Sequence, residues 1–176
     1  MDGMTRGTII SITGKGGVGK TATTSLILRT LIESTKNKKI LVVDADPATN
    51  LPRVLNVPVE RTVGMVATDL KKRINEGSLS PGTAKQELLE SWVFDIIVET
   101  EHFDLLTMGR TQGEGCYCYV NASLRRIIDT LVDNYDIILM DMEAGLEHLS
   151  RRTEHDVDLF IIVTDPSQMG FDTAER

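Results

Sequence analysis

The sequence predicts an α/β fold in which a mostly parallel central sheet is flanked by helices. Short apolar runs rich in β-branched residues alternate with segments of helical periodicity, which favours parallel strands joined by right-handed crossovers. The run at 40–43 contains no polar residue, as is typical of a strand covered on both faces. With 176 residues, of which 41% are hydrophobic, the chain is long enough for one core and too short for two full domains. We therefore expect a single domain over residues 1–176.

The expected elements follow one another in a regular order. Residues 8–13 form an apolar, β-branched run, which is followed by glycines and then by a half-buried helical pattern over residues 21–33. A polar turn precedes a continuous apolar strand at 40–43. The sequence stops six residues into a further helical pattern, so we expect a domain that lacks its last βα units. The remaining expected strands are 103–108, 135–140 and 158–164, and the remaining expected helices are 63–74, 83–98, 121–132 and 171–176.

Composition and charge disfavour several classes of partner. The formal net charge of −7 and the isoelectric point near 5.0 oppose a broad attraction to nucleic acid or to anionic lipid. The sequence contains no run of eighteen apolar residues and no pattern of a secretory leader, so we expect a cytoplasmic protein that binds neither membrane nor nucleic acid. In a reducing compartment the two cysteines are not expected to form a structural disulfide.

A glycine-rich motif between the first expected strand and the first expected helix predicts a P-loop. Its residues fit GxxxxGK[ST], and the strand before it and the helix after it are the context that distinguishes a phosphate loop from an ordinary turn, which is the alternative. Backbone N–H groups of the loop would surround phosphate oxygens, Lys20 would reach the β and γ phosphates, and the Thr21 hydroxyl would bind Mg²⁺. The predicted nucleotide-binding residues are Gly14, Lys15, Gly16, Gly17, Val18, Gly19, Lys20, Thr21 and Ala22.

Three acidic residues follow expected strands and are expected at the same edge of the sheet. Asp44 and Asp46 come directly after the strand at 40–43, at the edge where open α/β sheets bind ligands, and Asp44 is expected to support Mg²⁺ or Asp46. Asp141 ends the strand before it in the manner of a Walker B element and is expected to hold Mg²⁺ directly or through water. Gly145 is placed to offer a backbone N–H to the γ phosphate. For each acid, the alternative is a turn or a helix cap.

The pair Cys116 and Cys118 is a candidate metal site. In extended backbone, residues two apart project to the same face, so the two thiols can converge while Tyr117 points away. One chain supplies only two ligands, whereas a twofold dimer supplies four, enough for Zn²⁺ or an iron–sulfur cluster and usable by Ni²⁺. The alternative is two ordinary buried or surface cysteines.

The segment GKGGVGKT at 14–21 resembles the deviant Walker A motif of the ParA, MinD and nitrogenase iron protein group. This resemblance implies that Lys15 crosses a nucleotide-sandwich dimer to the partner's phosphates, where it would stabilise transition-state charge as an arginine finger does. It also implies that Asp46 positions or activates the attacking water, which makes Lys15, Lys20 and Asp46 the catalytic candidates. Ala22 departs from the common GKTT ending and removes one hydroxyl near the α phosphate. For Lys15, the alternative is a solvated surface lysine.

Four segments occur in the same order in the CooC-type accessory ATPases, which mature carbon monoxide dehydrogenase: 14–21, 44–47, 116–118 and 141–149. The similarity extends over nearly the whole chain and is weakest over 58–101. It implies an ATP-hydrolysing metallochaperone that dimerises on nucleotide, holds Ni²⁺ or Zn²⁺ at Cys116 and Cys118 across the dimer, and assists nickel insertion into the dehydrogenase. Two rivals remain, a MinD/ParA-like positioning ATPase and an iron–sulfur scaffold or electron carrier. The choice of ATP over GTP rests on the resemblance alone.

Overall fold

The structure is a computed structural model that describes residues 6–79, 84–110, 128–142, 157–168 and 170–171. Within these residues the sheet has the strand order β3-β4-β2-β5-β1-β6, and every pair of neighbours is parallel except β3 and β4. The prediction of a mostly parallel sheet is therefore confirmed. The strands are β1 (Thr8–Gly14), β2 (Ile40–Asp44), β3 (Val98–Glu99), β4 (Asp104–Thr107), β5 (Ile137–Asp141) and β6 (Leu159–Val163).

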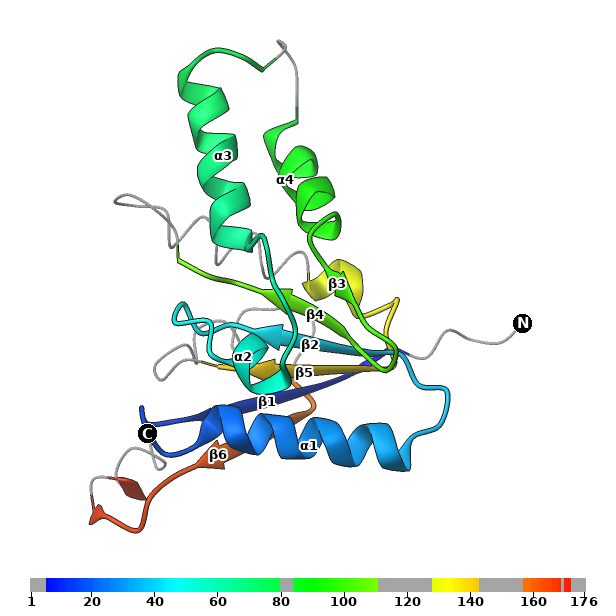
Figure 1. Cartoon of the computed structure of the whole chain (residues 1–176), viewed down its shortest axis with the longest axis vertical. Helices are drawn as coiled ribbons and strands as arrows, with labels where there is room; N and C mark the ends of the chain where they lie inside the picture. Colours follow the sequence, from blue (N-terminus) through cyan, green and yellow to red (C-terminus); the bar gives the residue numbers. More distant parts are fainter. Residues whose placement is uncertain (1–5, 80–83, 111–127, 143–156, 169, 172–176) are drawn as a thin grey trace.

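Helices cover both faces of this sheet. The long helix α1 (Lys20–Ser34) runs along one face together with the short helix α2 (Leu51–Leu55). The helices α3 (Val63–Asn75) and α4 (Lys85–Phe94) lie side by side and extend away from the sheet (Figure 1). The Arg73 guanidinium of α3 lies 4.8 Å from the centre of the Trp92 ring of α4 and joins the two helices by a cation–π contact. Among the described helices, none is both long and apolar enough to cross a membrane.

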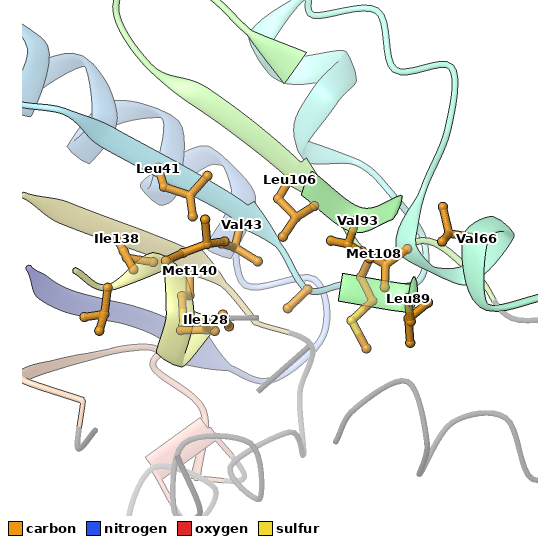
Figure 2. Close-up of a cluster of buried hydrophobic side chains, with 14 of the residues drawn as sticks. Leu41, Val43, Val66, Leu89, Val93, Leu106, Met108, Ile128, Ile138 and Met140 are labelled. Carbon is orange, nitrogen blue, oxygen red and sulfur yellow. The ribbon is translucent and has the colours of Figure 1, made fainter. Parts of the chain in front are cut away.

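Alternation along the strands divides the core into two layers. In β2, Leu41 and Val43 point to the layer shared with α3 and α4, whereas Ile40 and Val42 point to the layer shared with α1 and α2. Figure 2 shows the first layer, in which side chains of β2, β4 and β5 meet those of α3 and α4. Every residue of β2 is buried. The absence of polar residues from 40–43 is thereby explained, since neither face of this part of the strand meets water.

The structure corrects one expected element and adds another. The helix expected at 83–98 ends at Phe94, and Val98 belongs to β3, which pairs antiparallel with β4 through Val98 and Leu105. The β-branched run from Ile96 to Val98 suits a strand better than a helix. The short helix α2 was not expected, because its five residues are too few to show a period. Of the helix expected at 121–132, residues 128–131 are helical and 121–127 lie outside the described residues.

Candidate functional site

The site is built where β5 lies between β1 and β2. Because these strands are parallel, their carboxyl ends meet at one edge of the sheet, and the pairing register places Asp141 beside Ile12 of β1 and Asp44 of β2. The Asp141 carbonyl accepts a hydrogen bond from the Ala45 N–H at 2.9 Å, and the Ile12 carbonyl accepts one from the Met142 N–H at 2.9 Å. The two acidic strand ends and the start of the glycine loop are thus held together by backbone hydrogen bonds.

The glycines of the loop that follows β1 have two different structural reasons. Gly14 has a φ of +139°, and a Cβ on it would lie 2.0 Å from the Val163 carbonyl oxygen, so the close approach of β6 requires glycine here. Gly17 and Gly19 have φ values of +80° and +96°, and Gly19 is the N-cap of α1. Around Gly16, Gly17 and Gly19, an added Cβ would meet no atom of the described residues within 4 Å. The loop therefore borders open space at the positively charged end of α1, as an anion site requires.

Lys20 and two threonines connect the loop to Asp141. The Lys20 ammonium donates to the carbonyl oxygen of Lys15 at 3.2 Å, which closes the loop on itself. The Thr24 hydroxyl lies 3.3 Å from Asp141 Oδ1, and Thr21 lies close enough to the Asp141 carboxyl group to lower its pKa. Thr24 was not among the residues predicted from the sequence. Its signal was present, however, because it lies one helical turn after Thr21 and therefore on the same face of α1.

The Asp141 carboxyl group fits a ligand for a divalent cation. Its side chain is 1% exposed, and its Oδ2 atom is buried and has no hydrogen-bond partner among the described residues. Burial raises the pKa of Asp141 above its usual range, while hydrogen bonds from Thr21 and Thr24 and the charge of Lys20 act in the opposite direction. An oxygen without a partner, next to a threonine hydroxyl, is the type of donor set that Mg²⁺ takes beside phosphate. Thr21 and Asp141, the predicted magnesium ligands, are therefore brought together.

Asp44 has a different environment from the other acids. Its side chain is fully buried, Oδ1 accepts from the Asp46 N–H at 3.1 Å, and Oδ2 accepts from the Leu51 N–H at 3.2 Å. These bonds hold the loop that joins β2 to α2. The pKa of Asp44 is raised from 3.8 to about 7, chiefly by burial; the charges of Asp141 and Asp46 act in the same direction, and the two backbone hydrogen bonds act against it.

Asp46 lies in the tight turn after β2 and is half-buried. Its Oδ1 accepts from the Ala48 N–H at 2.8 Å, and its carbonyl accepts from the Thr49 N–H at 3.0 Å. The negative charge of Asp46 raises the pKa of both Asp44 and Asp141, so the three predicted acids belong to one electrostatic cluster.

The Lys15 side chain leaves the loop toward β6. Its ammonium lies 3.9 Å from Asp165 Oδ2, in the turn that follows β6, and the sequence alone did not suggest this pair. Val18 is half-buried and Ala22 is exposed near the start of α1. Gly145, Cys116 and Cys118 lie outside the described residues, so their roles stay predictions.

The open space over Gly16 gives a testable prediction. Gly16→Ala should leave the thermal unfolding temperature unchanged, because a methyl group at this position contacts nothing within 4 Å in the described part of the chain. The same methyl group would occupy the space that phosphate oxygens need, so the affinity for Mg-ATP should fall by at least about tenfold, the loss of one or more charge-assisted hydrogen bonds. Isothermal titration calorimetry and calorimetric melting check both parts. An unchanged affinity would place the phosphates elsewhere.

Asp44 predicts a pH dependence of stability. A carboxyl group whose pKa is higher in the folded state than in the unfolded chain stabilises the fold below pH 4, and this stability is lost as the pH rises through about 7. The free energy of unfolding of the wild type should therefore fall between pH 5 and pH 7, by up to about 1.4 kcal/mol per pH unit for one proton. Asp44→Asn should flatten this slope. Urea titrations in metal-free buffer measure it, and parallel profiles for the two proteins would contradict the prediction.

Comparison with known proteins agrees with this geometry. The family model described as an AAA domain matches residues 7–175. An uncharacterized ATP-binding protein of Methanocaldococcus jannaschii is 52% identical over 168 residues, which are 96% of this chain and 66% of that protein. The carbon monoxide dehydrogenase accessory protein CooC of Rhodospirillum rubrum is 35% identical over 178 residues, 95% of this chain and 66% of that protein. The chain thus spans about two thirds of the length of these relatives.

A solved relative carries the expected ligand. The septum site-determining protein MinD of Pyrococcus horikoshii, in complex with Mg-ADP, is 27% identical and superposes with a TM-score of 0.64 over 94% of this chain and 61% of that chain. The match of the family model over nearly the whole chain and this shared fold lead to one conclusion. The chain belongs to the AAA domain family and is a member of the MinD/ParA-like P-loop ATPases.

Proposed function

We propose that this protein binds and hydrolyses Mg-ATP at the carboxyl edge of β1, β2 and β5. The observation that carries the proposal is the buried Oδ2 atom of Asp141, which has no hydrogen-bond partner in the described part of the chain and lies beside the phosphate loop and the threonines of α1. Such an acceptor is costly in a protein interior unless it binds a cation or a donor. The open space around Gly16, Gly17 and Gly19 supplies room for phosphate next to it.

Each residue at this edge has a role in the proposed reaction. The loop amides and the start of α1 bind phosphate oxygens, and Lys20 exchanges its hydrogen bond to the Lys15 carbonyl for one to the β and γ phosphates. Thr21 and Asp141 hold Mg²⁺, which neutralises charge on the phosphates when it is bound. Asp44 fixes the loop that carries Asp46, through the Asp46 N–H and the Leu51 N–H.

Asp46 and Lys15 are proposed to act on the reaction itself. Asp46 is half-buried in the turn after β2, on the same edge as Asp141, and it is the candidate that orients the attacking water. Lys15 is proposed to reach the phosphates of a second copy of the chain, so that hydrolysis requires a nucleotide-bridged dimer. The backbone of Lys15 lies in the loop, while its side chain is directed to the turn after β6.

We further propose that the ATPase cycle serves metal delivery. The similarity to CooC supports nickel insertion into carbon monoxide dehydrogenase as the process and that dehydrogenase as the client. Cys116 and Cys118 would hold Ni²⁺ or Zn²⁺ together with the same pair of the partner subunit, because four thiolates complete a tetrahedral site. Dimerisation on ATP and release after hydrolysis would then couple the metal site to the nucleotide site.

The catalytic role proposed for Asp46 can be separated from binding. Asp46→Asn keeps the size of the side chain and the acceptor for the Ala48 N–H, so Mg-ATP affinity should stay within about twofold while turnover falls by about a hundredfold or more, as expected for loss of a general base. Lys20→Ala should instead lose binding. Equilibrium titration and phosphate release measure the two quantities, and normal turnover by Asp46→Asn would remove this residue from the mechanism.

The metal role is tested by anaerobic stoichiometry of nickel and zinc with a nonhydrolysable ATP analogue. The wild type should bind about one ion per dimer, and the Cys116→Ser/Cys118→Ser variant should bind none, because the site needs both thiolates of each chain. The matched control is ATP hydrolysis, which should persist in the double variant. Iron with labile sulfide would instead indicate a cluster carrier. No metal in either protein would contradict metal delivery and leave a MinD-like switch as the function.

A further inference from the structure

The turn after β6 contains a carboxylate that is held in a fixed orientation. Asp165 Oδ1 accepts hydrogen bonds from both the Ser167 N–H, at 3.0 Å, and the Ser167 hydroxyl. The Ser167 oxygen in turn accepts from the Gly170 N–H at 3.0 Å. Oδ1 is therefore occupied by Ser167, and Oδ2 faces the Lys15 ammonium, with 3.9 Å between the two atoms.

The backbone around this turn keeps it against the phosphate loop. Gly170 is buried, and a Cβ on it would lie 2.5 Å from the Asp165 carbonyl oxygen and 2.6 Å from Asp165 Oδ1. At the other side of the turn, Gly14 packs against the Val163 carbonyl and pairs with Val163 across the sheet. The pairing of Gly14 with Val163 therefore holds the turn beside the phosphate loop, Gly170 keeps the turn compact, and the contact between Lys15 and Asp165 is made by their side chains.

We propose that Asp165 is a positioning residue that holds Lys15 within its own chain until a partner subunit takes it. This inference rests on the proposed function, in which Lys15 acts on the phosphates of a second copy. One lysine ammonium cannot serve both the Asp165 carboxylate and a partner's phosphates, so each chain must break this ion pair when the dimer forms. Asp165 thereby sets the protein concentration at which dimers assemble, and it leaves the turnover of an assembled dimer unchanged.

The strength of the pair limits the size of the effect. The Lys15 and Asp165 side chains are 35% and 39% exposed, and ion pairs at such exposure are weak and screened by salt. Releasing each pair should change the dimerisation equilibrium by about two- to fivefold, and a dimer releases two of them. This range suits a contact that must break in every cycle, since a strong buried pair would prevent exchange.

The first experiment tests the contact in the isolated chain. Hydrogen bonds from Ser167 and the charge of Lys15 hold the pKa of the Asp165 carboxyl below its usual range. Carboxyl-carbon NMR titration should therefore show a higher pKa for Asp165 in Lys15→Ala than in the wild type. The matched control is Arg6→Gln, which removes an ion pair of similar exposure, to Asp158 at the other end of β6, and should leave the Asp165 titration unchanged. An unshifted titration in Lys15→Ala would overturn the proposal.

The second experiment measures dimerisation by sedimentation over a series of protein concentrations, with Mg²⁺ and a nonhydrolysable ATP analogue. Asp165→Asn should lower the midpoint, the protein concentration at which half of the chains are dimeric, by about two- to fivefold for each pair released. Turnover at saturating protein should be the same as in the wild type. Ser167→Ala keeps both charges but loosens the carboxylate, so it should shift the midpoint in the same direction by less. If Asp165→Asn acted only by removing a negative charge, Ser167→Ala would dimerise at the same protein concentration as the wild type. This result would overturn the positioning role.

The two experiments fail separately. If Asp165 titrates as expected but Asp165→Asn dimerises at the wild-type midpoint, the ion pair exists and its role in assembly is wrong. If no variant dimerises at any concentration, the proposed dimer mechanism is wrong and Asp165 loses its role with it, while the NMR titration still decides whether the ion pair forms.

Discussion

The pairing of β5 between β1 and β2 is the constraint on which the rest of the site depends. The register places Asp141 between Ile12 and Asp44. A residue far along the chain thereby lies next to the glycine loop that follows β1. Each of these strands is parallel to its neighbours, and parallel pairing puts all their carboxyl ends at one edge. The two core layers then fix the strands, because each side chain of β2 is buried on one face or the other.

That edge concentrates negative charge where burial makes it unfavourable. Asp44 and Asp141 are almost wholly buried, and Asp46 lies close enough for its charge to raise the pKa of both. The three acids are distinguished by their partners. Asp44 is bound by two backbone N–H groups, Asp46 accepts from the backbone of its own turn, and Asp141 retains an oxygen with no partner among the described residues. This difference agrees with the structural role proposed for Asp44 and with the proposal that Asp141 binds a cation.

The two lysines of the loop also differ in the partners of their side chains. Lys20 lies at the start of α1, turns back to the Lys15 carbonyl, and its charge reaches Asp141. Lys15 points to Asp165, at the end of β6, and among the described residues it forms no ion pair with the acids of β2 and β5. A lysine held at the rim by a weak, exposed pair is available to another molecule, whereas Lys20 is directed into the site of its own chain.

Local patterns were enough to determine much of this protein. The glycine loop, the helix that follows it, the apolar strands and the acids at their ends could all be predicted, because each depends on nearest neighbours in sequence and on a short period. The tertiary structure decided what depends on distant contacts. These include the hydrogen bond between Thr24 and Asp141 and the ion pair between Lys15 and Asp165. In both cases the two partners lie far apart in the sequence and are brought together by strand order and register. The spacing of Thr24 from Thr21 indicates the helix face on which Thr24 lies, but the sequence does not place Asp141 beside that face.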